Sequence, residues 1–327
     1  MKVERENVRK VGIVTLSNLG DNILLTPAIW NLGMYFDKAE FYVFTPLDSG
    51  EIFSFLPRLR EVVPYNREKD GRCSLIKALR RRKLDLVVDF RCTIVPWFSG
   101  ARYKPVFIFK EFFLSKDNIH EADRNVIMLR DVLGIPVKNH GLIFPVKDED
   151  RVWIKDIFDK NSISDEKKIV LAIGANWDKK RWPIEKFAML ADLLSQTDKC
   201  WFFLVGNRRD EEKLASRFME LTNANVINLI RKTSLGRLAA LLEVADLLVS
   251  NDTGILHLAS AVHTPTVGIF GPGGWKRYGP YSNKHAVVHL DLPCIPCNKN
   301  YCKYGDFRCI RDIPVEMVER ACYEIWN

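Results

Sequence analysis

The sequence predicts an α/β fold of two domains, each a doubly wound parallel sheet covered by helices. Three observations predict it. Short apolar runs alternate with segments of helical periodicity, a pattern typical of parallel strands that are buried on both faces. The same alternation starts again after a polar segment in the middle of the chain. The length of 327 residues suits two domains of roughly 100–200 residues each.

The N-terminal half contains three predicted strands and three predicted helices. The strands are apolar and rich in β-branched or aromatic residues, and they cover residues 11–16, 41–44 and 84–89. A polar turn, Ser17-Asn18-Leu19-Gly20-Asp21-Asn22, follows the first of them. The helices are expected over residues 23–36 with a kink near Pro27, over 75–82, and over 122–133 with an end at Gly134.

Residues 147–168 are polar and charged and predict a linker. We therefore expect one domain over residues 1–162 and a second over residues 163–327, with packing of the last helix back on the first domain as an option. In the second domain the predicted strands cover residues 169–173, 201–205, 226–229, 247–250 and 266–270. The predicted helices there cover residues 185–194, 210–221, 235–245 and 255–261. Open parallel sheets bind ligands at the carboxyl ends of their strands, so we expect the site there.

The net charge of +8 is concentrated in one stretch of the chain. Residues 58–110 contain 14 basic and 5 acidic residues, a net charge of +9, so the remaining residues sum to −1. This excess indicates an anionic partner: nucleic acid, a phosphorylated glycolipid or an acidic membrane surface. The alternative is a solvated basic helix over Leu75–Lys83 without a function. No aromatic residues interleave Arg80-Arg81-Arg82-Lys83, which argues against nucleic acid.

Two further patterns concern location. No stretch approaches the roughly 18 apolar residues of a membrane-spanning helix. The start, MKVERENVRK, is charged, and the apolar run after it is too short for a signal peptide. We therefore expect a cytoplasmic protein.

Four of the eight cysteines lie within 16 residues, namely Cys294, Cys297, Cys302 and Cys309. A reducing cytoplasm disfavours disulfides, and four thiolates this close can occupy the corners of one tetrahedron. A structural zinc site is therefore one interpretation. The other is a loop of thiols that packs for structural reasons, and neither interpretation gives these cysteines a part in catalysis.

The strongest local motif is Ser250-Asn251-Asp252-Thr253-Gly254-Ile255-Leu256-His257-Leu258-Ala259. A buried strand runs directly into a helix, which Asp252 or Thr253 can cap, and Gly254 allows a ligand to approach the backbone. The free N–H groups of such a helix can bind a phosphate. His257 follows one turn later. The alternative is an ordinary capped connection between a strand and a helix.

Two more loops after predicted strands carry basic residues. Residues 174–183, GANWDKKRWP, hold Lys180 and Arg181 between two tryptophans, an arrangement that suits a diphosphate. Residues 270–280, FGPGGWKRYGP, form a loop rich in Gly and Pro that can enclose a ligand. Neither loop is a dinucleotide-binding GxGxxG or a Walker loop, which argues against NAD-binding and P-loop proteins.

The SNLGDN turn, GANWDKKRWP, NDTGILHLA and FGPGGWKRYGP, in this order and spacing, resemble glycosyltransferase family 9, the heptosyltransferases of the lipopolysaccharide inner core. The resemblance covers nearly the whole chain. It implies a GT-B architecture, in which two Rossmann-like domains face each other across a cleft, the N-terminal one binding the acceptor and the C-terminal one an ADP-sugar. It also implies an inverting transfer of heptose from ADP-heptose to a hydroxyl group of the inner core, with no metal or other cofactor in catalysis.

The resemblance assigns roles to individual residues. Asp21 is expected to be the general base, for which the alternative is a helix N-cap, and Lys180 is expected to bind phosphate. Glu211 is expected to hold the ribose. The remaining residues expected on the donor side are Asn176, Asp252, Thr253, Gly254 and His257.

The acceptor side departs from the family pattern. Members commonly carry Arg where this chain has Thr15, and often Ser-Ser where it has Ser17-Asn18. The expected acceptor-side residues are Asn18, Arg91 and His120. The partner implied is an anionic, lipid-linked saccharide, with transient contact to the inner leaflet and no nucleic acid, so the protein is expected to be peripheral at the cytoplasmic face of the inner membrane.

Two other functions fit parts of the pattern. One is a GT-B enzyme with another nucleotide-sugar donor or acceptor, or a sugar epimerase such as UDP-GlcNAc 2-epimerase. The other is a basic module that binds RNA or a membrane through Arg80–Lys83 and the cysteine loop. The second leaves the Asp-Thr-Gly and Lys-Arg-Trp motifs unexplained.

Overall fold

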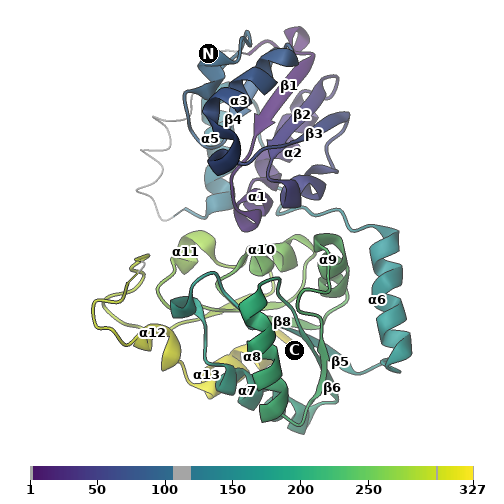
Figure 1. Cartoon of the computed structure of the whole chain (residues 1–327), viewed down its shortest axis with the longest axis vertical. Coiled ribbons are helices and arrows are strands. Elements are labelled where there is room, and N and C mark those ends of the chain that lie inside the picture. Colours follow the sequence, from purple (N-terminus) through teal and green to yellow (C-terminus); the bar gives the residue numbers. More distant parts are fainter. Residues whose placement is uncertain (1–2, 106–118, 300, 327) are drawn as a thin grey trace. The chain divides into compact units, whose positions relative to one another are not determined.

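The computed structural model describes residues 3–105, 119–299 and 301–326, and the chain divides into two compact units, Met1–Pro145 and Val146–Asn327 (Figure 1). Each unit has its own sheet, and neighbouring strands within each sheet pair in parallel. Helices cover the sheets, so the predicted α/β class with two parallel-sheet domains is confirmed.

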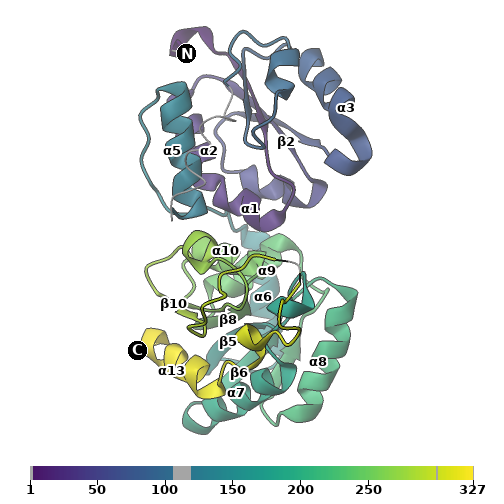
Figure 2. The same ribbon diagram turned by 90° about the vertical axis from the view of Figure 1, so that its left-hand side faces the viewer.

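The N-terminal unit has a four-stranded sheet with the order β3-β2-β1-β4. Its strands are β1 (Lys10–Val14), β2 (Glu40–Thr45), β3 (Leu59–Pro64) and β4 (Leu86–Asp89). Its helices are α1 (Leu19–Leu24), α2 (Thr26–Tyr35), α3 (Arg67–Arg81) and α5 (Glu121–Leu133), with short 3₁₀ segments η1 (Arg5–Asn7), η2 (Leu47–Phe53) and η3 (Val95–Phe98). Figure 2 shows α2 and α5 on one side of this sheet and α3 on the other.

The C-terminal unit has a six-stranded sheet with the order β10-β9-β8-β5-β6-β7. Its strands are β5 (Lys167–Ala172), β6 (Cys200–Leu204), β7 (Asn225–Asn228), β8 (Leu247–Asn251), β9 (Thr266–Ile269) and β10 (His285–Val288). Its helical elements are α6 (Asp148–Lys160), η4 (Asp178–Lys180), α7 (Ile184–Thr197), α8 (Arg209–Leu221), α9 (Leu235–Glu243), α10 (Gly254–Ala261), α11 (Trp275–Tyr278), α12 (Arg308–Arg311) and α13 (Val315–Trp326).

Both faces of the second sheet are buried, because successive side chains of a strand point to opposite faces. On one face Ile169 and Leu171 join a core with residues of α7, α8 and α13. On the other face Phe203 lies 5.7 Å from the ring of Phe158 in α6. This double burial explains why β5, β6 and β8 are continuous apolar runs in the sequence.

At the predicted kink near Pro27 the helix is interrupted at one residue, Leu25, whose backbone angles stay helical. Helix α1 ends at Leu24, and α2 starts at Thr26 with Pro27 in its first turn, where the missing N–H group of proline costs no helical hydrogen bond. The edge strands β3 and β10 were not predicted from the sequence. None of the residues of β3 is buried and only Val288 of β10 is, so neither strand shows the continuous apolar run of a strand buried on both faces.

The linker predicted over residues 147–168 is wrong, and so is the boundary at residues 162 and 163. The segment forms α6, and the units divide after Pro145. Only Asp150 and Ile154 of this helix are buried, which explains its polar sequence. Arg151 donates to Glu243 of α9 through Nε at 2.7 Å and Nη2 at 2.8 Å, so α6 is part of the C-terminal unit.

The last helix also belongs to the C-terminal unit. Val318 and Cys322 of α13 are fully buried in the same core as Ile169, and the helix contacts α7 and β10. These contacts place α13 in the C-terminal unit, and its packing on the N-terminal domain, the option stated above, stays a prediction. Over the described ranges, none of the helices is both long and apolar enough to cross a membrane.

Candidate active site

Three loops of the C-terminal unit meet because they follow adjacent strands. Strand β8 pairs with β5 on one side and β9 on the other, so the loops that leave their carboxyl ends lie together. These loops are the three segments that the sequence singled out, residues 174–183, 252–253 and 270–274. The structure thus brings the predicted donor-side motifs to one edge of one sheet.

Lys180 and Asp252 form an ion pair at this edge. The Nζ atom of Lys180 lies 2.5 Å from Oδ2 of Asp252, and the side chains are 22% and 12% exposed. The same Nζ lies 5.4 Å from the ring centre of Trp177. A cation held between a carboxylate and an aromatic face keeps a fixed position, and a ligand phosphate can compete with Asp252 for it.

Asn251, which the sequence analysis did not select, joins two of the loops. Its Oδ1 accepts a hydrogen bond from the backbone N–H of Trp182 at 2.9 Å, and its Nδ2 donates to the carbonyl groups of Ile173 and Gly174 at 2.9 and 3.1 Å. Asn251 is fully buried. It therefore fixes the loop that carries Lys180 to the strand that carries Asp252.

Thr253 caps α10, which decides between the two caps that the sequence allowed. Its Oγ1 accepts a hydrogen bond from the backbone N–H of Ile255 at 3.3 Å, and Gly254 is the first helical residue. Asp252 is left to pair with Lys180. His257 is buried one turn further along this helix.

The third loop contacts the ion pair through Gly273. A Cβ atom at Gly273 would lie 2.2 Å from Oδ2 of Asp252, whereas a Cβ atom at Gly274 would meet nothing nearer than 3.5 Å. Only glycine at position 273 leaves Asp252 in place. This requirement depends on a tertiary contact, so the sequence alone did not indicate it.

Glu211 lies at the carboxyl ends of β5 and β6. Its Oε2 accepts a hydrogen bond from the backbone N–H of Arg208 at 2.9 Å. Cβ atoms at Gly174 and Gly206 would lie 1.8 and 2.2 Å from its carboxylate oxygens, so two glycines make room for it. Burial raises the pKa of Glu211, and the nearby charge of Asp210 adds to this rise. A buried carboxylate at this edge is suited to accept hydrogen bonds from hydroxyl groups.

The other polar residues of the loop that carries Lys180 differ in burial and in their partners. Arg181 donates to the carbonyl group of Ala175 and pairs with Asp210, so it is held within the protein. Asn176, expected on the donor side, is exposed on the same loop. Lys179 is buried, with Nζ 4.4 Å from the ring centre of Trp177, and burial lowers its pKa.

The N-terminal unit contains a cavity of about 1120 Å³ at the carboxyl ends of its strands. Its lining combines hydroxyl, amide and charged groups from the loops after all four strands. These residues include Thr15, Ser17, Asn18, Asp48, Tyr65, Asn66, Lys69, Asp70 and Arg91. Such a mixture suits a ligand rich in hydroxyl groups that also carries charge.

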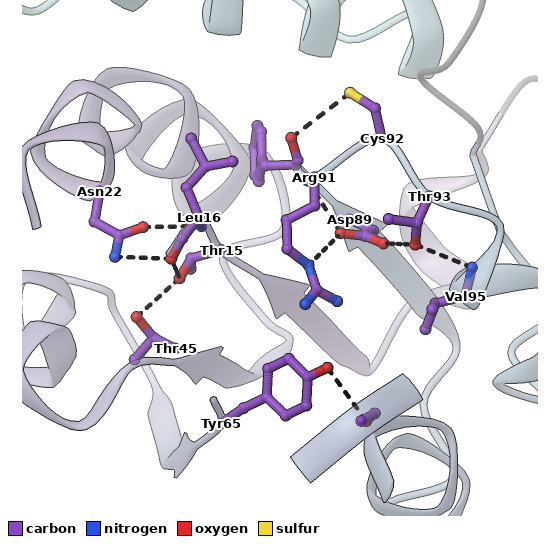
Figure 3. Close-up of polar contacts among 12 residues, drawn as sticks. Thr15, Leu16, Asn22, Thr45, Tyr65, Asp89, Arg91, Cys92, Thr93 and Val95 are labelled. Atoms are coloured by element: carbon purple, nitrogen blue, oxygen red, sulfur yellow. Dashed lines mark hydrogen bonds and ion pairs between the residues drawn. The ribbon is translucent and has the colours of Figure 1, made fainter. Parts of the chain in front are cut away.

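The turn after β1, which contributes Ser17 and Asn18 to the lining of this cavity, is fixed by Asn22, which the sequence analysis did not select. The fully buried Asn22 accepts from the N–H of Leu16 at 2.9 Å and donates to its carbonyl group at 3.1 Å (Figure 3). Asp21 lies in the first turn of α1, half-buried, and its Oδ2 accepts from Nδ2 of Asn18 at 2.8 Å. The N-cap position belongs to Asn18, so the alternative of Asp21 as the N-cap is excluded.

Arg91 reaches the cavity as a fixed cation. Its Nε donates to Oδ1 of Asp89 at 3.3 Å, and its Cζ lies 4.9 Å from the ring centre of Tyr65. The side chain is only 8% exposed. Figure 3 shows its terminal nitrogens directed away from Asp89, and within the described residues no protein group accepts from them. This edge of the guanidinium can bind a carboxylate or a phosphate with two parallel hydrogen bonds.

His120, the other acceptor-side candidate, has a structural position. It is the N-cap of α5, and its Nδ1 accepts a hydrogen bond from the backbone N–H of Ala122 at 3.2 Å. It is not among the described residues that line the cavity.

The four clustered cysteines surround one small cavity of about 140 Å³, together with Lys179. All four are free thiols. Burial raises the pKa of Cys309 to about 11, whereas backbone N–H groups of Phe307 and Tyr304 lower the pKa of Cys302. Across residues 3–105, 119–299 and 301–326, no three His, Cys, Asp or Glu side chains are placed to hold a metal ion. A zinc site at these four thiols is therefore not seen among the described residues.

Comparisons with known proteins identify a family for the chain. A sequence model of glycosyltransferase family 9 (heptosyltransferase) matches residues 72–307. The chain is 27% identical over 314 residues to lipooligosaccharide heptosyltransferase 2 of Campylobacter jejuni, covering 92% of this chain and 94% of the relative.

Solved structures share the fold. A glycosyltransferase of family 9 from Veillonella parvula superposes with a TM-score of 0.82 at 22% identity, covering 99% of this chain and 98% of the other. The Escherichia coli heptosyltransferase WaaC, solved with ADP-2-deoxy-2-fluoro heptose, superposes with a TM-score of 0.66 at 20% identity, covering 96% and 99%. The predicted GT-B fold class is thereby confirmed.

Proposed function

Because the chain belongs to glycosyltransferase family 9, the heptosyltransferases, we propose that it transfers heptose from ADP-heptose to a hydroxyl group of the lipopolysaccharide inner core. The relative from Campylobacter jejuni bears the name of a lipooligosaccharide heptosyltransferase, and a structural neighbour was solved with an ADP-heptose analogue. The observation that carries the proposal is the Lys180–Asp252 pair beside the N-terminus of α10, in a chain of this family.

The donor side is proposed to act on the leaving group. When the bond between the anomeric carbon and the diphosphate oxygen breaks, ADP departs with the electron pair and negative charge grows on that oxygen. Lys180 and the backbone N–H groups at the start of α10 are the groups proposed to stabilise it, and loss of one such donor typically costs about 3–4 kcal/mol. Glu211 is proposed to hold the ribose hydroxyl groups. With these positive groups in place the proposed reaction requires no metal ion.

The acceptor side is proposed to supply the nucleophile. An acceptor hydroxyl attacks the anomeric carbon as ADP leaves, and its proton passes to the carboxylate of Asp21. Base assistance of this kind contributes roughly 10²–10⁴ in rate. A single displacement inverts the anomeric configuration, as in glycosidases that act in one step. Asn18 and Arg91 are proposed to bind the acceptor, Arg91 through an anionic group.

A lipid-linked acceptor has a consequence for location. Its sugars project from a membrane surface, so we propose that the enzyme works as a peripheral protein at the cytoplasmic face of the inner membrane.

The substitution Asp21→Asn tests the proposed base. It removes the proton acceptor but keeps the size of the side chain, so we expect transfer to fall by roughly 10²–10⁴ while ADP binding stays unchanged. Turnover is measured with ADP-heptose and purified acceptor, and ADP binding by calorimetry. Asp37→Asn, at an exposed carboxylate of the same unit, is the control and should behave like wild type. If Asp21→Asn kept a tenth of the wild-type turnover, the assignment of the base would be wrong.

The donor is tested separately. Calorimetry with ADP, UDP and GDP should show preferential binding of ADP, and NMR of the product should show an inverted anomeric centre. Preference for UDP would favour another GT-B transferase. Release of nucleotide without an added acceptor would favour an epimerase or a hydrolase.

A further inference from the structure

The segment after β4 exposes three large apolar side chains within five residues. Ile94, Trp97 and Phe98 are 50%, 62% and 49% exposed. Single exposed apolar residues are ordinary, but a contiguous group marks an interaction surface. The proposed chemistry uses none of the three, and they do not line the cavity of the N-terminal unit.

This apolar group lies against a basic helix. The Nε atom of Arg80 in α3 donates to the carbonyl group of Phe98 at 2.7 Å, which joins the last turn of α3 to η3. Residues 72–83 contain six basic residues and no acidic residue. Two elements from different parts of the chain therefore place apolar and positive side chains next to each other.

The basic side chains of residues 72–83 differ in their surroundings. Arg82 is directed inward, since it pairs with Glu61 at 2.6 Å and lies over the ring of Phe44 at 5.3 Å. Lys77, Arg80 and Arg81 are exposed, and they lie within about one helical turn of one another. In the part of the chain that the structure describes, none of these three has a carboxylate partner. Their charge is therefore available to an external anion.

We propose that Ile94, Trp97 and Phe98 with Lys77, Arg80 and Arg81, together called the η3–α3 surface, dock the enzyme on an anionic lipid bilayer. Tryptophan has an apolar ring system and a polar N–H group, which suits it to the boundary between headgroups and acyl chains. Lysine and arginine beside it are attracted to anionic headgroups. The proposal rests on the proposed function, because a lipid-linked acceptor requires the enzyme to work at such a boundary.

Charge complementarity favours a bilayer over a second copy of the chain. Two η3–α3 surfaces that met across a twofold axis would bring two sets of unpaired positive charges together, which is unfavourable. An anionic bilayer neutralises the same charges and also accepts the apolar side chains.

Vesicle flotation tests the docking surface without using activity. We expect the full chain to float with vesicles of phosphatidylethanolamine and phosphatidylglycerol, and much less with vesicles of phosphatidylcholine. The double variant Trp97→Ala/Phe98→Ala and the double variant Lys77→Glu/Arg81→Glu should each lower partitioning by roughly tenfold or more. High salt should weaken binding of the wild type.

Matched controls come from the same unit. Met34→Ala removes an exposed apolar side chain from α2, and Lys38→Glu reverses an exposed charge outside the surface. Both should float like wild type. Thermal unfolding verifies folding, and if the aromatic variant does not fold, the charge-reversal variant still decides the result.

Three outcomes would overturn the proposal. The first is flotation of both double variants at the wild-type level, and the second is equal binding to neutral and anionic vesicles. The third is a dimer in sedimentation velocity that becomes monomeric in Trp97→Ala/Phe98→Ala, since a second copy would then cover the surface.

Activity separates this inference from the proposed function. The two double variants should keep wild-type turnover on a soluble acceptor fragment without lipid, and lose it on acceptor embedded in vesicles. If the wild type transferred heptose to neither acceptor, the proposed function would fail while the flotation result would still decide the docking surface.

Discussion

At the scale of single residues, the site depends on close contacts that only glycine permits. Gly273 lies against Asp252, and Gly174 and Gly206 lie against Glu211. Neither Gly273 nor Gly174 has a positive φ. At these two positions glycine is therefore needed for its missing side chain and not for its backbone conformation. Small residues at strand ends and the carboxylates of Asp252 and Glu211 were visible in the sequence, but the contacts between them were not.

Gly273→Ala should disturb the Lys180–Asp252 pair, because the new Cβ atom would meet Oδ2 of Asp252 at 2.2 Å and the carboxylate would have to move. We expect kcat/KM for the donor to fall by roughly tenfold or more, equivalent to about 1.4 kcal/mol. Gly274→Ala is the matched control, with only ordinary contacts around the added atom. Steady-state kinetics with varied ADP-heptose compares the two, and equal losses would argue against a role for the Gly273 contact.

Glu211→Gln should change how stability depends on pH. Burial raises the pKa of Glu211 in the folded state, so between its ordinary value and the raised value the folded state binds more protons than the unfolded state. The free energy of unfolding therefore falls as pH rises through this window, and the wild type stays less stable above it. Glutamine does not titrate, so the variant should have the higher melting temperature at neutral pH and lose this advantage in acid.

Thermal unfolding of wild type and Glu211→Gln from about pH 4 to about pH 8 measures this difference. Glu212→Gln, at an exposed neighbour, is the control. Because Glu211 is also the proposed ribose partner, Glu211→Gln should bind ADP more weakly although it is more stable. Parallel stability curves for Glu211→Gln and wild type would contradict the argument.

At the scale of elements, burial decides which parts of the fold could be predicted from the sequence. Strands such as β5 and β8 are buried on both faces and form continuous apolar runs, so they were predicted within one to two residues. The exposed edge strand β3 and the mostly exposed helix α6 show no such run and were missed. Likewise, the positions of Lys180 and Asp252 followed from their place after strands, but the joining role of Asn251 required the fold.

Helix α6 contacts α9 through both side-chain packing and an ion pair. We predict that the packing contributes more to the free energy of unfolding than the ion pair does. A Cβ atom at Gly236 would lie 2.3 Å from Oδ2 of Asp150. Overpacking of this kind costs about 1–3 kcal/mol, offset in part by the better helix propensity of alanine, about 1 kcal/mol. The ion pair between Arg151 and Glu243 is partly exposed, with the side chains 43% and 32% exposed, and contributes only about 0–1 kcal/mol.

We therefore expect Gly236→Ala to destabilise the protein by up to about 2 kcal/mol, more than Arg151→Ala does. Urea unfolding measures both. The double variant Gly236→Ala/Asp150→Ala removes the clash and should recover the stability lost in Gly236→Ala. A larger loss from Arg151→Ala would show that charge, not packing, holds α6.

At the scale of the whole molecule, the two units differ in charge as well as in sequence. Residues 1–145 contain 23 basic and 17 acidic residues, a net charge of +6, which leaves +2 for residues 146–327. The proposed anionic acceptor and the proposed bilayer both belong to the more positive unit. The donor residues all lie in the other unit, so each substrate is proposed to have its own unit, with its own sheet and core.

This division predicts that ADP stabilises only one unit. A ligand that binds the folded state at about 100 times its Kd adds about 2.7 kcal/mol, which raises the melting temperature of a domain of this size by roughly 5–10 °C. Calorimetry of the full chain should show two transitions, of which ADP raises one. Gly236→Ala, a substitution in the C-terminal unit, should lower that same transition and thereby identify it. A single transition that ADP shifts as a whole would mean that the two units unfold as one cooperative body, so that occupation of the donor site stabilises the acceptor unit as well.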